Sequence, residues 1–382
     1  MEYVRSLRPQ NSPEFNEAWS LLRASDRTRI AHLDAGLAAH EGIGWMLGAP
    51  IPANLRVAEG RNVFDAQING DAPLTRMTLS NGLAAGMIEW PDHGIKTLSV
   101  LMSDNDHMRG VIPGATIVPY RVANGPLFRY SELAEGAPRS ATAAVGRALE
   151  LAMGAAVPAR VASISMGNPG MGPVDFFRGL LGGDIGMARE TGKAVDRAWE
   201  GGMIIVCAAG QIINTVVYPA RYARTIAVGG YDKFGGLLTH YPPQGYQDPD
   251  RVDIWAQAQR INRAGLRGKG ADAHPVWAED DGDGGDPSGT SYAAPQVAAA
   301  AALWVEMYHA KLETLFAGER WRIVESFRAA LRASADREIP RFVGGTRPGR
   351  AIRVLNIPRL LTTPPPEDGL TRPGPAASAG FW

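Results

Sequence analysis

The sequence predicts an α/β fold in which a mostly parallel β-sheet is flanked by helices. Two observations support this prediction: short apolar runs alternate with longer segments of helical periodicity, and polar or glycine residues follow directly after several of the apolar runs. Strands are expected at 28–33, 115–121, 160–165, 203–208 and 225–229. Helices are expected at 93–104, 139–154, 186–201, 291–312 and 320–335. Sites in such sheets lie beyond the carboxyl ends of the strands, so the residues found there are the first candidates for function.

The chain divides into three parts along its length. An N-terminal extension, 1–27, contains one short amphipathic stretch that predicts a helix. The main domain covers 28–361, and its two long connections, 48–90 and 232–286, are expected to be loops, the first with room for a hairpin. The tail, 362–382, is rich in Pro, Gly, Ala and Ser and is expected to be largely disordered.

Composition excludes several classes of partner. The formal net charge is zero, which argues against a nucleic-acid partner or a polybasic membrane contact. No apolar run reaches the roughly 18 residues of a membrane span. The single cysteine, Cys207, allows no intrachain disulfide and is expected to be a buried core thiol. The first residues lack the apolar segment of a signal peptide, so a cytoplasmic location is expected; the oligomeric state stays open.

Residues 289–295, Gly-Thr-Ser-Tyr-Ala-Ala-Pro, place an exposed serine at the start of an alanine-rich helix. Pro295 is tolerated in a first turn, where its missing N–H has no intrahelical partner to lose. Ser291 would gain from the positive end of the helix dipole and from free backbone N–H groups, which could also hold a developing oxyanion. The same features fit an ordinary serine near a helix cap.

A serine nucleophile needs a base, and the base needs an orienting carboxylate. Asp34 follows the strand 28–33, which would deliver it to the C-terminal edge of the sheet. His93 is selected among the seven histidines because Gly-x-x-Thr follows it at a helix start. His32, two residues before Asp34, is expected to be structural. For Asp34 itself, a buried structural carboxylate is the alternative.

The order Asp, His, Ser along the chain is the subtilisin order, and the chain resembles the subtilisin-like serine proteases (subtilases). Further segments resemble the family in its linear order, between about residues 28 and 361: 110–122, 163–167, 204–210, 218–220, 225–229, 252–256 and 349–361. The resemblance implies the subtilisin-like three-layer fold with helices on both sides of the sheet.

The resemblance also implies serine endopeptidase chemistry on a peptide or protein. Ser291 would attack the peptide carbonyl and form an acyl-enzyme intermediate, His93 would transfer the proton, and Asp34 would orient the imidazole. Only 33 residues precede Asp34, too few for the folding pro-domain of secreted members, so the chain resembles the intracellular ones. A cytoplasmic protease must be restrained, which favours a narrow substrate such as one precursor peptide or partner protein.

Two positions depart from the family pattern. The family has Thr or Ser after the aspartate, whose hydroxyl supports the carboxylate, whereas this chain has Ala35. The family presents an oxyanion-binding Asn where this chain has Gln211, whose amide is one methylene further out. Gln211 could reach the oxyanion, it could turn away and leave the backbone N–H of Ser291 as the donor, or Asn214 could substitute. This departure motivates the alternative function, a weak or inactive subtilase that acts as a peptide-binding or regulatory module.

The resemblance places substrate recognition on the strand Ser165, Met166 and Gly167, where an extended peptide would pair by β-augmentation. Gly167 would let the peptide approach closely. Ala208, Ala209 and Gly210 would line the pocket for the residue before the scissile bond, and their small size leaves room for a medium-to-large apolar side chain.

No cofactor is expected, with one open question about calcium. The loop Glu279–Asp286 is rich in carboxylates, and oxygen ligands at this spacing can bind Ca²⁺. The alternative is a solvated acidic loop rich in glycine.

Overall fold

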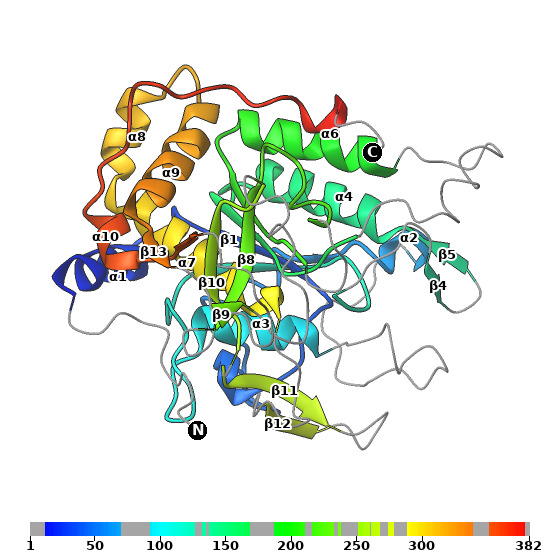
Figure 1. Cartoon of the computed structure of the whole chain (residues 1–382). Helices are drawn as coiled ribbons and strands as arrows, with labels where there is room; N and C mark the ends of the chain where they lie inside the picture. The colour runs from blue at the N-terminus through cyan, green and yellow to red at the C-terminus, as the bar shows by residue number, and fades with distance from the viewer. Residues whose placement is uncertain are drawn as a thin grey trace, which may run out of the picture.

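The computed structural model describes residues 12–69, 92–126, 132–134, 137–168, 187–210, 216–232, 236–237, 251–259, 261–267, 274–278, 289–338 and 351–378. Within these residues, ten strands form one twisted sheet at the centre of the molecule (Figure 1). The order across the sheet is β13-β14-β10-β8-β7-β6-β1-β3-β2, and β9 pairs with β8 outside this path.

The centre of the sheet is parallel throughout. Its strands are β1 (Ile30–Asp34), β3 (Ile117–Arg121), β6 (Val161–Ile164), β7 (Ile204–Ala208), β8 (Ile226–Asp232) and β10 (Ile254–Gln257). The parallel strands β2 (Arg61–Asn62) and β14 (Ile352–Val354) lie further out, and β9 (Gly236–Leu237) and β13 (Asp336–Glu338) are antiparallel additions. Two hairpins stand apart from the sheet: β4–β5 (Glu132–Ala134, Ala137–Arg139) and β11–β12 (Arg263–Arg267, His274–Ala278).

Helices cover both faces of the sheet, which gives the predicted three layers (Figure 1). One side carries α3 (His93–Met102), α7 (Thr290–Met307), α1 (Pro13–Ala24), α8 (His309–Leu315), α9 (Trp321–Ser334) and α10 (Ile357–Leu361). The other side carries α4 (Ala141–Gly154) and α6 (Met187–Glu200). The remaining described helical turns are α2 (Ala66–Asn69), η1 (Glu41–Ile43) and η4 (Ala376–Ser378).

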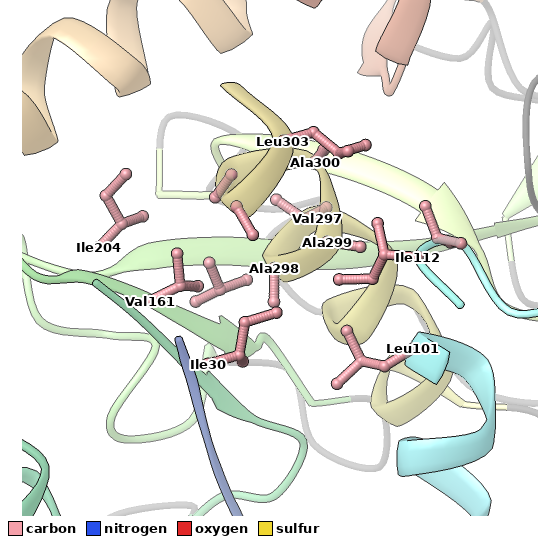
Figure 2. Packing of buried hydrophobic residues seen from close by; sticks show 14 of the residues in the cluster. Ile30, Leu101, Ile112, Val161, Ile204, Val297, Ala298, Ala299, Ala300 and Leu303 are labelled. Atoms are coloured by element: carbon pink, nitrogen blue, oxygen red, sulfur yellow. The ribbon is translucent and has the colours of Figure 1, made fainter. Parts of the chain in front are cut away.

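The strands read as continuous apolar runs because each face of the sheet is buried. In β1, Ile30 belongs to the core around α7, whereas its neighbours Ala31 and Leu33 belong to the core under α4. Helix α7 runs through the first core, where Val297, Ala298 and Ala300 pack between sheet and neighbouring helices (Figure 2). Small side chains let this helix lie close to the strands, so its N-terminus is held at the edge where β1, β6 and β7 end.

Each predicted strand and helix overlaps an observed element, with one helix divided. The helical pattern over 291–312 is interrupted at Tyr308, whose φ of −105° and ψ of 15° end α7 and separate it from α8. In the described part of the first long connection, 48–69, the hairpin is not found: β2 pairs in parallel with β3 instead. Within 232–286, the β11–β12 hairpin was not predicted.

The N-terminal helix is part of the main body. Phe15, Ala18 and Leu22 of α1 are buried in the core shared with α7, and Trp19 Nε1 donates to Pro113 O at 2.9 Å. Arg27, just after the helix, is bonded to Glu306, about four helical turns along α7 from Ser291. The extension therefore packs at the end of α7 that is remote from the candidate nucleophile.

The C-terminal tail differs from the expectation of disorder over residues 362–378. It runs as an ordered segment back to α6 (Figure 1), where Ala376 is buried and its N–H donates to Asp196 Oδ1 at 2.6 Å. On the way, Ser326 Oγ of α9 donates to Pro366 O at 2.8 Å. Composition indicated too little apolar burial for order, but hydrogen bonds from side chains of the body to the tail backbone supply the missing anchorage.

Candidate active site

Asp34 lies at the carboxyl end of β1, and three donors surround its carboxylate. The Ala35 N–H and His93 Nδ1 both lie 2.7 Å from Oδ1, and Thr97 Oγ1 lies 2.9 Å from Oδ2. Only 1% of Asp34 is exposed. Burial raises the pKa of this carboxyl, but His93 and the hydrogen bonds outweigh burial and hold the pKa below its ordinary value. The group is therefore ionised and fixed in orientation.

His93 is the first residue of α3, and a close approach of this helix to β1 brings it to Asp34. A Cβ atom at Gly94 would lie 2.1 Å from the Gly36 carbonyl oxygen, so only glycine permits this contact. The preceding Asp92 pairs with Lys96 Nζ at 3.0 Å and accepts the Leu266 N–H of β11 at 3.1 Å. The hairpin thereby holds the start of α3, which explains why the imidazole has a defined place.

Ser291 is half-buried in the first turn of α7, and its hydroxyl faces the end of β6. Its Oγ donates to Ser165 O at 2.6 Å. Across the described residues, His93 Nε2 is buried without a hydrogen-bond partner. The ring of Tyr292, next to the serine, lies 6.4 Å from the His93 ring. The structure thus joins Asp34 to His93 and brings the α7 N-terminus beside them, while Ser291 and His93 are not hydrogen-bonded in this conformation.

The N-terminus of α7 is tied to the strand ends around it. Gly210, after β7, donates its N–H to Thr290 Oγ1 at 3.2 Å, and Gly289 donates to Ala258 O at 3.2 Å. The first N–H groups of a helix have no intrahelical acceptor, so the Ser291 N–H is available to an oxyanion at this end. The predicted oxyanion residue Gln211 and its substitute Asn214 lie outside the described residues.

Backbone groups of the predicted substrate-binding strand already form hydrogen bonds with other residues of the chain. Ser165 O accepts the Ser291 hydroxyl, and the Gly167 N–H donates to Pro126 O at 2.9 Å. Asn168 and Tyr218 exchange two backbone hydrogen bonds of 2.8 Å. Met166 is buried. A peptide that pairs with this segment must therefore replace bonds that the chain already makes.

Val217 packs against two of the glycines that were predicted to bind substrate. A Cβ at Gly167 would lie 2.2 Å from Val217 Cγ2, and a Cβ at Gly210 would lie 2.7 Å from Val217 Cγ1. Ala208 and Ala209 are buried in the two cores on either face of the sheet. Gly167 and Gly210 thus accommodate the valine, and the expected room for a medium-to-large apolar side chain stays a prediction, because 169–186 and 211–215 lie outside the described residues.

Two residues around Asp34 were not assigned to the site from sequence. Thr97, one turn after His93, supplies the hydroxyl that Ala35 lacks, and His32 lies behind it with Nε2 2.9 Å from Thr97 Oγ1. The period of two along β1 places His32 on the same face as Asp34, which was the available signal. Cys207 is a buried core thiol as predicted, and burial raises its pKa.

No group of three or more potential metal ligands occurs in the part of the chain that the structure describes. The acidic loop Glu279–Asp286 lies outside that part, so calcium binding there stays a prediction. None of the described helices has the length and apolar character needed to cross a bilayer.

An Asp–His pair and a helix-borne serine at one edge of a parallel sheet are features of the subtilisin class of serine proteases. A sequence model described as the subtilase family matches residues 82–346, more than half of the chain. The chain therefore belongs to the subtilase family of serine proteases, which act on peptides or proteins. The matched range contains His93 and Ser291 and begins after Asp34.

Two solved structures are similar to this chain in fold. The prenylagaramide maturation protease PagA matches with 19% sequence identity and a TM-score of 0.55, over 92% of this chain and 98% of its own. A protease from Pseudoalteromonas arctica PAMC 21717 matches with 16% identity and a TM-score of 0.59, over 93% of this chain and 94% of its own. No curated protein matches the chain.

Proposed function

We propose that the chain is a serine endopeptidase that hydrolyses peptide bonds through Asp34, His93 and Ser291. The observation that supports this most directly is the buried Asp34–His93 hydrogen bond of 2.7 Å, at the sheet edge where α7 presents Ser291. A buried imidazole held by a carboxylate at Nδ1 has its other nitrogen available as a base. In a chain of the subtilase family, the Asp34–His93 pair would supply the general base of a catalytic triad. A carboxylate with a purely structural role would not.

In the proposed reaction, the Ser291 hydroxyl leaves Ser165 O and turns to His93 Nε2. His93 removes the hydroxyl proton as Oγ attacks the peptide carbonyl, and the imidazolium gives that proton to the leaving amine when the C–N bond breaks. Water then attacks the acyl-enzyme, again losing a proton to His93, and Ser291 is regenerated. The Ser291 N–H is one oxyanion donor, and Gln211 is the proposed second.

Binding of the peptide itself favours this rotation. An extended substrate that pairs with Ser165–Gly167 competes for Ser165 O, the acceptor that holds the Ser291 hydroxyl at 2.6 Å. Displacing the hydroxyl from Ser165 O frees it for His93. We therefore propose that substrate pairing and nucleophile activation occur together.

The proposed substrate is narrow, such as one precursor peptide or one partner protein. Val217 between Gly167 and Gly210 favours a small residue before the scissile bond. A structural neighbour bears the name of a maturation protease, which is consistent with processing of one precursor. Comparable rates of degradation on many unrelated unfolded proteins would contradict this narrow specificity.

The function is tested by covalent labelling with a fluorophosphonate probe, read by peptide mass spectrometry. We expect the probe on Ser291 of the unmodified chain, and no labelling of Ser291→Ala or His93→Ala. Circular dichroism of each variant checks that the fold is kept. Labelling at another serine, or equal labelling of folded His93→Ala, would rule out the proposed nucleophile and base.

A second candidate function is a peptide-binding or regulatory module with weak or no activity. The observation that favours it is the Ser291 hydroxyl bonded to Ser165 O, with His93 Nε2 unpartnered among the described residues. The replacement of the oxyanion Asn by Gln211 points the same way. A folded chain that binds a peptide but is not labelled at Ser291 would establish this alternative.

A further inference from the structure

The buried histidine that precedes Asp34 reaches the site through a threonine. His32 Nε2 lies 2.9 Å from Thr97 Oγ1, which in turn lies 2.9 Å from Asp34 Oδ2. His32 and Asp34 point to the same face of β1, and Thr97 comes one helical turn after His93 on α3. Each of these four side chains belongs to a residue that is no more than 1% exposed. They form a continuous buried chain that ends at the His93 imidazole.

The hydrogen atoms in this chain have one consistent arrangement. An ionised carboxylate only accepts, and the Thr97 hydroxyl has a single hydrogen. Two backbone oxygens, those of His93 and Gly94, lie 3.2 Å from this hydroxyl, farther than the charged Asp34 Oδ2 at 2.9 Å. The hydroxyl therefore donates to Asp34. It follows that His32 Nε2 carries a hydrogen and donates to Thr97 Oγ1.

We propose that Thr97 and His32 are positioning residues that hold the Asp34 carboxylate in the orientation in which it binds His93. Thr97 replaces, from another element, the hydroxyl that the residue after the aspartate would supply if it were not Ala35. The inference rests on the proposed function, because it assigns a purpose to the orientation of the Asp34–His93 pair.

A neutral donor suits this position better than a cation. Burial lowers the pKa of His32 to about 4, so its imidazole is uncharged at neutral pH. The titratable groups that act on Asp34 are His93 from α3 and His32 from its own strand, and the nearby charges at the start of α3 are paired as Asp92–Lys96 at 3.0 Å. The hydrogen-bonded pair His32–Thr97 thus orients the Asp34 carboxylate. The negative charge of Asp34 stays available to the His93 imidazolium.

The decisive variant is Thr97→Val, which removes the hydroxyl and keeps the shape. The readout is the rate of Ser291 labelling by a fluorophosphonate probe as a function of pH. We expect the plateau rate to fall about tenfold to a hundredfold, the range that a hydrogen bond to a charged group represents. The pH midpoint should move upward, because a carboxylate that has lost a donor holds the imidazolium proton more strongly.

Companion variants separate positioning from stability. Thr97→Ser keeps the hydroxyl and should restore both rate and midpoint. His32→Leu leaves the hydroxyl on Asp34 and should change both readouts in the same direction but less. The matched control is Thr142→Val in α4, another buried threonine, on the opposite face of the sheet, which should change neither. A merely structural role of Thr97 would lower stability without moving the midpoint.

A second readout keeps this inference separate from the proposed function. The titration midpoint of the His93 imidazole signals, measured by NMR on the full chain, should also move upward in Thr97→Val. If the unmodified chain is not labelled, the proposed function fails, yet an upward midpoint in the NMR titration still supports the positioning role. An unchanged NMR midpoint in folded Thr97→Val overturns the positioning role, whatever the labelling result.

Discussion

At the scale of single residues, the site depends on how closely α3 approaches the end of β1. A methyl group in place of a hydrogen on the Gly94 Cα would lie 2.1 Å from Gly36 O. A larger residue there must push the helix start away from the strand. Since His93 is the adjacent residue, the displacement falls directly on its 2.7 Å contact with Asp34.

We therefore expect Gly94→Ala to reduce the rate of Ser291 labelling by about a hundredfold, the cost of a displacement of about 1 Å at a reacting group. The matched control is Gly154→Ala at the end of α4, where nothing lies within 4 Å of the added Cβ. That variant should label at the unmodified rate. Equal rates for the two variants would show that the approach of α3 does not set the position of His93.

From the position of the Val217 side chain, we predict a preference for a small residue before the scissile bond. Val217→Ala removes the two methyl groups that lie between Gly167 and Gly210. We expect cleavage to extend from small to medium-sized apolar residues, measured by mass spectrometry on a peptide library with the unmodified chain alongside. Val216→Ala, a buried neighbour, serves as the control. An unchanged preference in Val217→Ala would place the pocket elsewhere.

Sequence patterns predicted Asp34 and His93 but not what holds them. The apolar run before Asp34 and the Gly-x-x-Thr that follows His93 are local signals, readable within a few residues. Thr97 is the threonine of that Gly-x-x-Thr, but its contact with Asp34, 63 residues away, depends on how α3 packs against β1. The Ser291–Ser165 contact spans 126 residues and depends equally on how the strands assemble.

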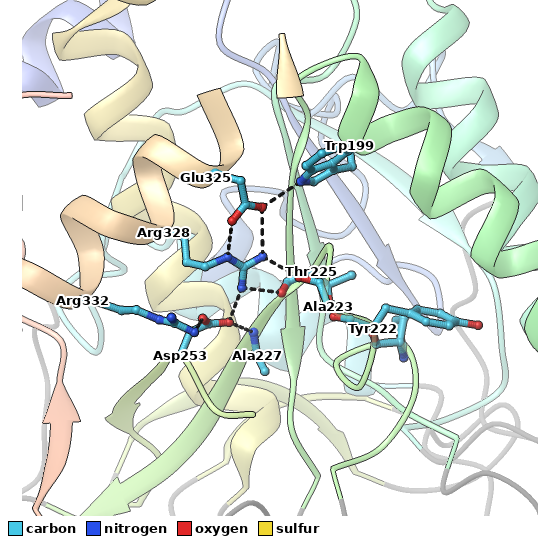
Figure 3. Close-up of polar contacts among 10 residues, drawn as sticks. Trp199, Tyr222, Ala223, Thr225, Ala227, Asp253, Glu325, Arg328 and Arg332 are labelled. Atoms are coloured by element: carbon cyan, nitrogen blue, oxygen red, sulfur yellow. Dashed lines mark hydrogen bonds and ion pairs between the residues drawn. The ribbon is translucent and has the colours of Figure 1, made fainter. Parts of the chain in front are cut away.

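At the scale of elements, α9 is anchored to the sheet by a buried cluster of charges (Figure 3). Arg328 contacts Asp253 Oδ2 at 2.8 Å and Glu325 Oε2 at 3.0 Å, and also donates to the backbone oxygens of Ala223 and Thr225. Burial lowers the pKa of this guanidinium, but the two carboxylates outweigh it and raise the pKa above its ordinary value. The cluster is satisfied only while all its members are present.

Arg328→Met should lower the free energy of unfolding by about 3–5 kcal/mol, because it removes the guanidinium that contacts both buried carboxylates, although Asp253 keeps Arg332 and Glu325 keeps the Trp199 N–H. Chemical denaturation measures this loss. Arg322→Met, on the same helix but partly exposed, is the control and should change stability by less than about 1 kcal/mol. Similar losses in both variants would mean that the cluster contributes no more than a surface pair.

Some of the secondary-structure elements could be predicted from sequence patterns, and others could not. Periodicity predicted α3, α4, α6 and α9, although all ten residues of α3 are buried and not just one stripe. The break between α7 and α8 at Tyr308 lies inside one continuous helical pattern, and the Tyr308 hydroxyl donates to Leu361 O at 2.6 Å, a contact with a distant segment. The β11–β12 hairpin is held on α3 by contacts such as Leu266 N–H to Asp92 at 3.1 Å, which are equally nonlocal.

At the scale of the whole molecule, the protonation of His32 makes the free energy of unfolding depend on pH. In the unfolded chain a histidine titrates near 6.5, whereas burial lowers the pKa of His32 to about 4 in the folded protein. Between these values the unfolded chain binds a proton that the folded chain does not. Stability from this group is therefore complete above about pH 6.5 and is lost as the pH falls toward about 4.

We expect the free energy of unfolding to decrease across that pH window, and to decrease less steeply in His32→Leu. Denaturation at a series of pH values measures both slopes. His40 and His309, whose pKa values are also lowered mainly by burial, act in the same direction in both proteins and cancel in the difference. Identical slopes would mean that His32 is protonated in the folded chain.

Sequence patterns that extend over a few positions were sufficient to predict the parallel sheet, its helices and the Asp–His–Ser candidates. These patterns are apolar runs, helical periodicity and turn residues, and the same residues carry the resemblance to subtilases. Tertiary packing decided the hydroxyl partner of Asp34, the resting position of the Ser291 hydroxyl and the packing of Val217 against Gly167 and Gly210. It also ordered residues 362–378, against the compositional expectation. These features depend on groups from distant segments, whose positions are defined only when the two cores close around the sheet.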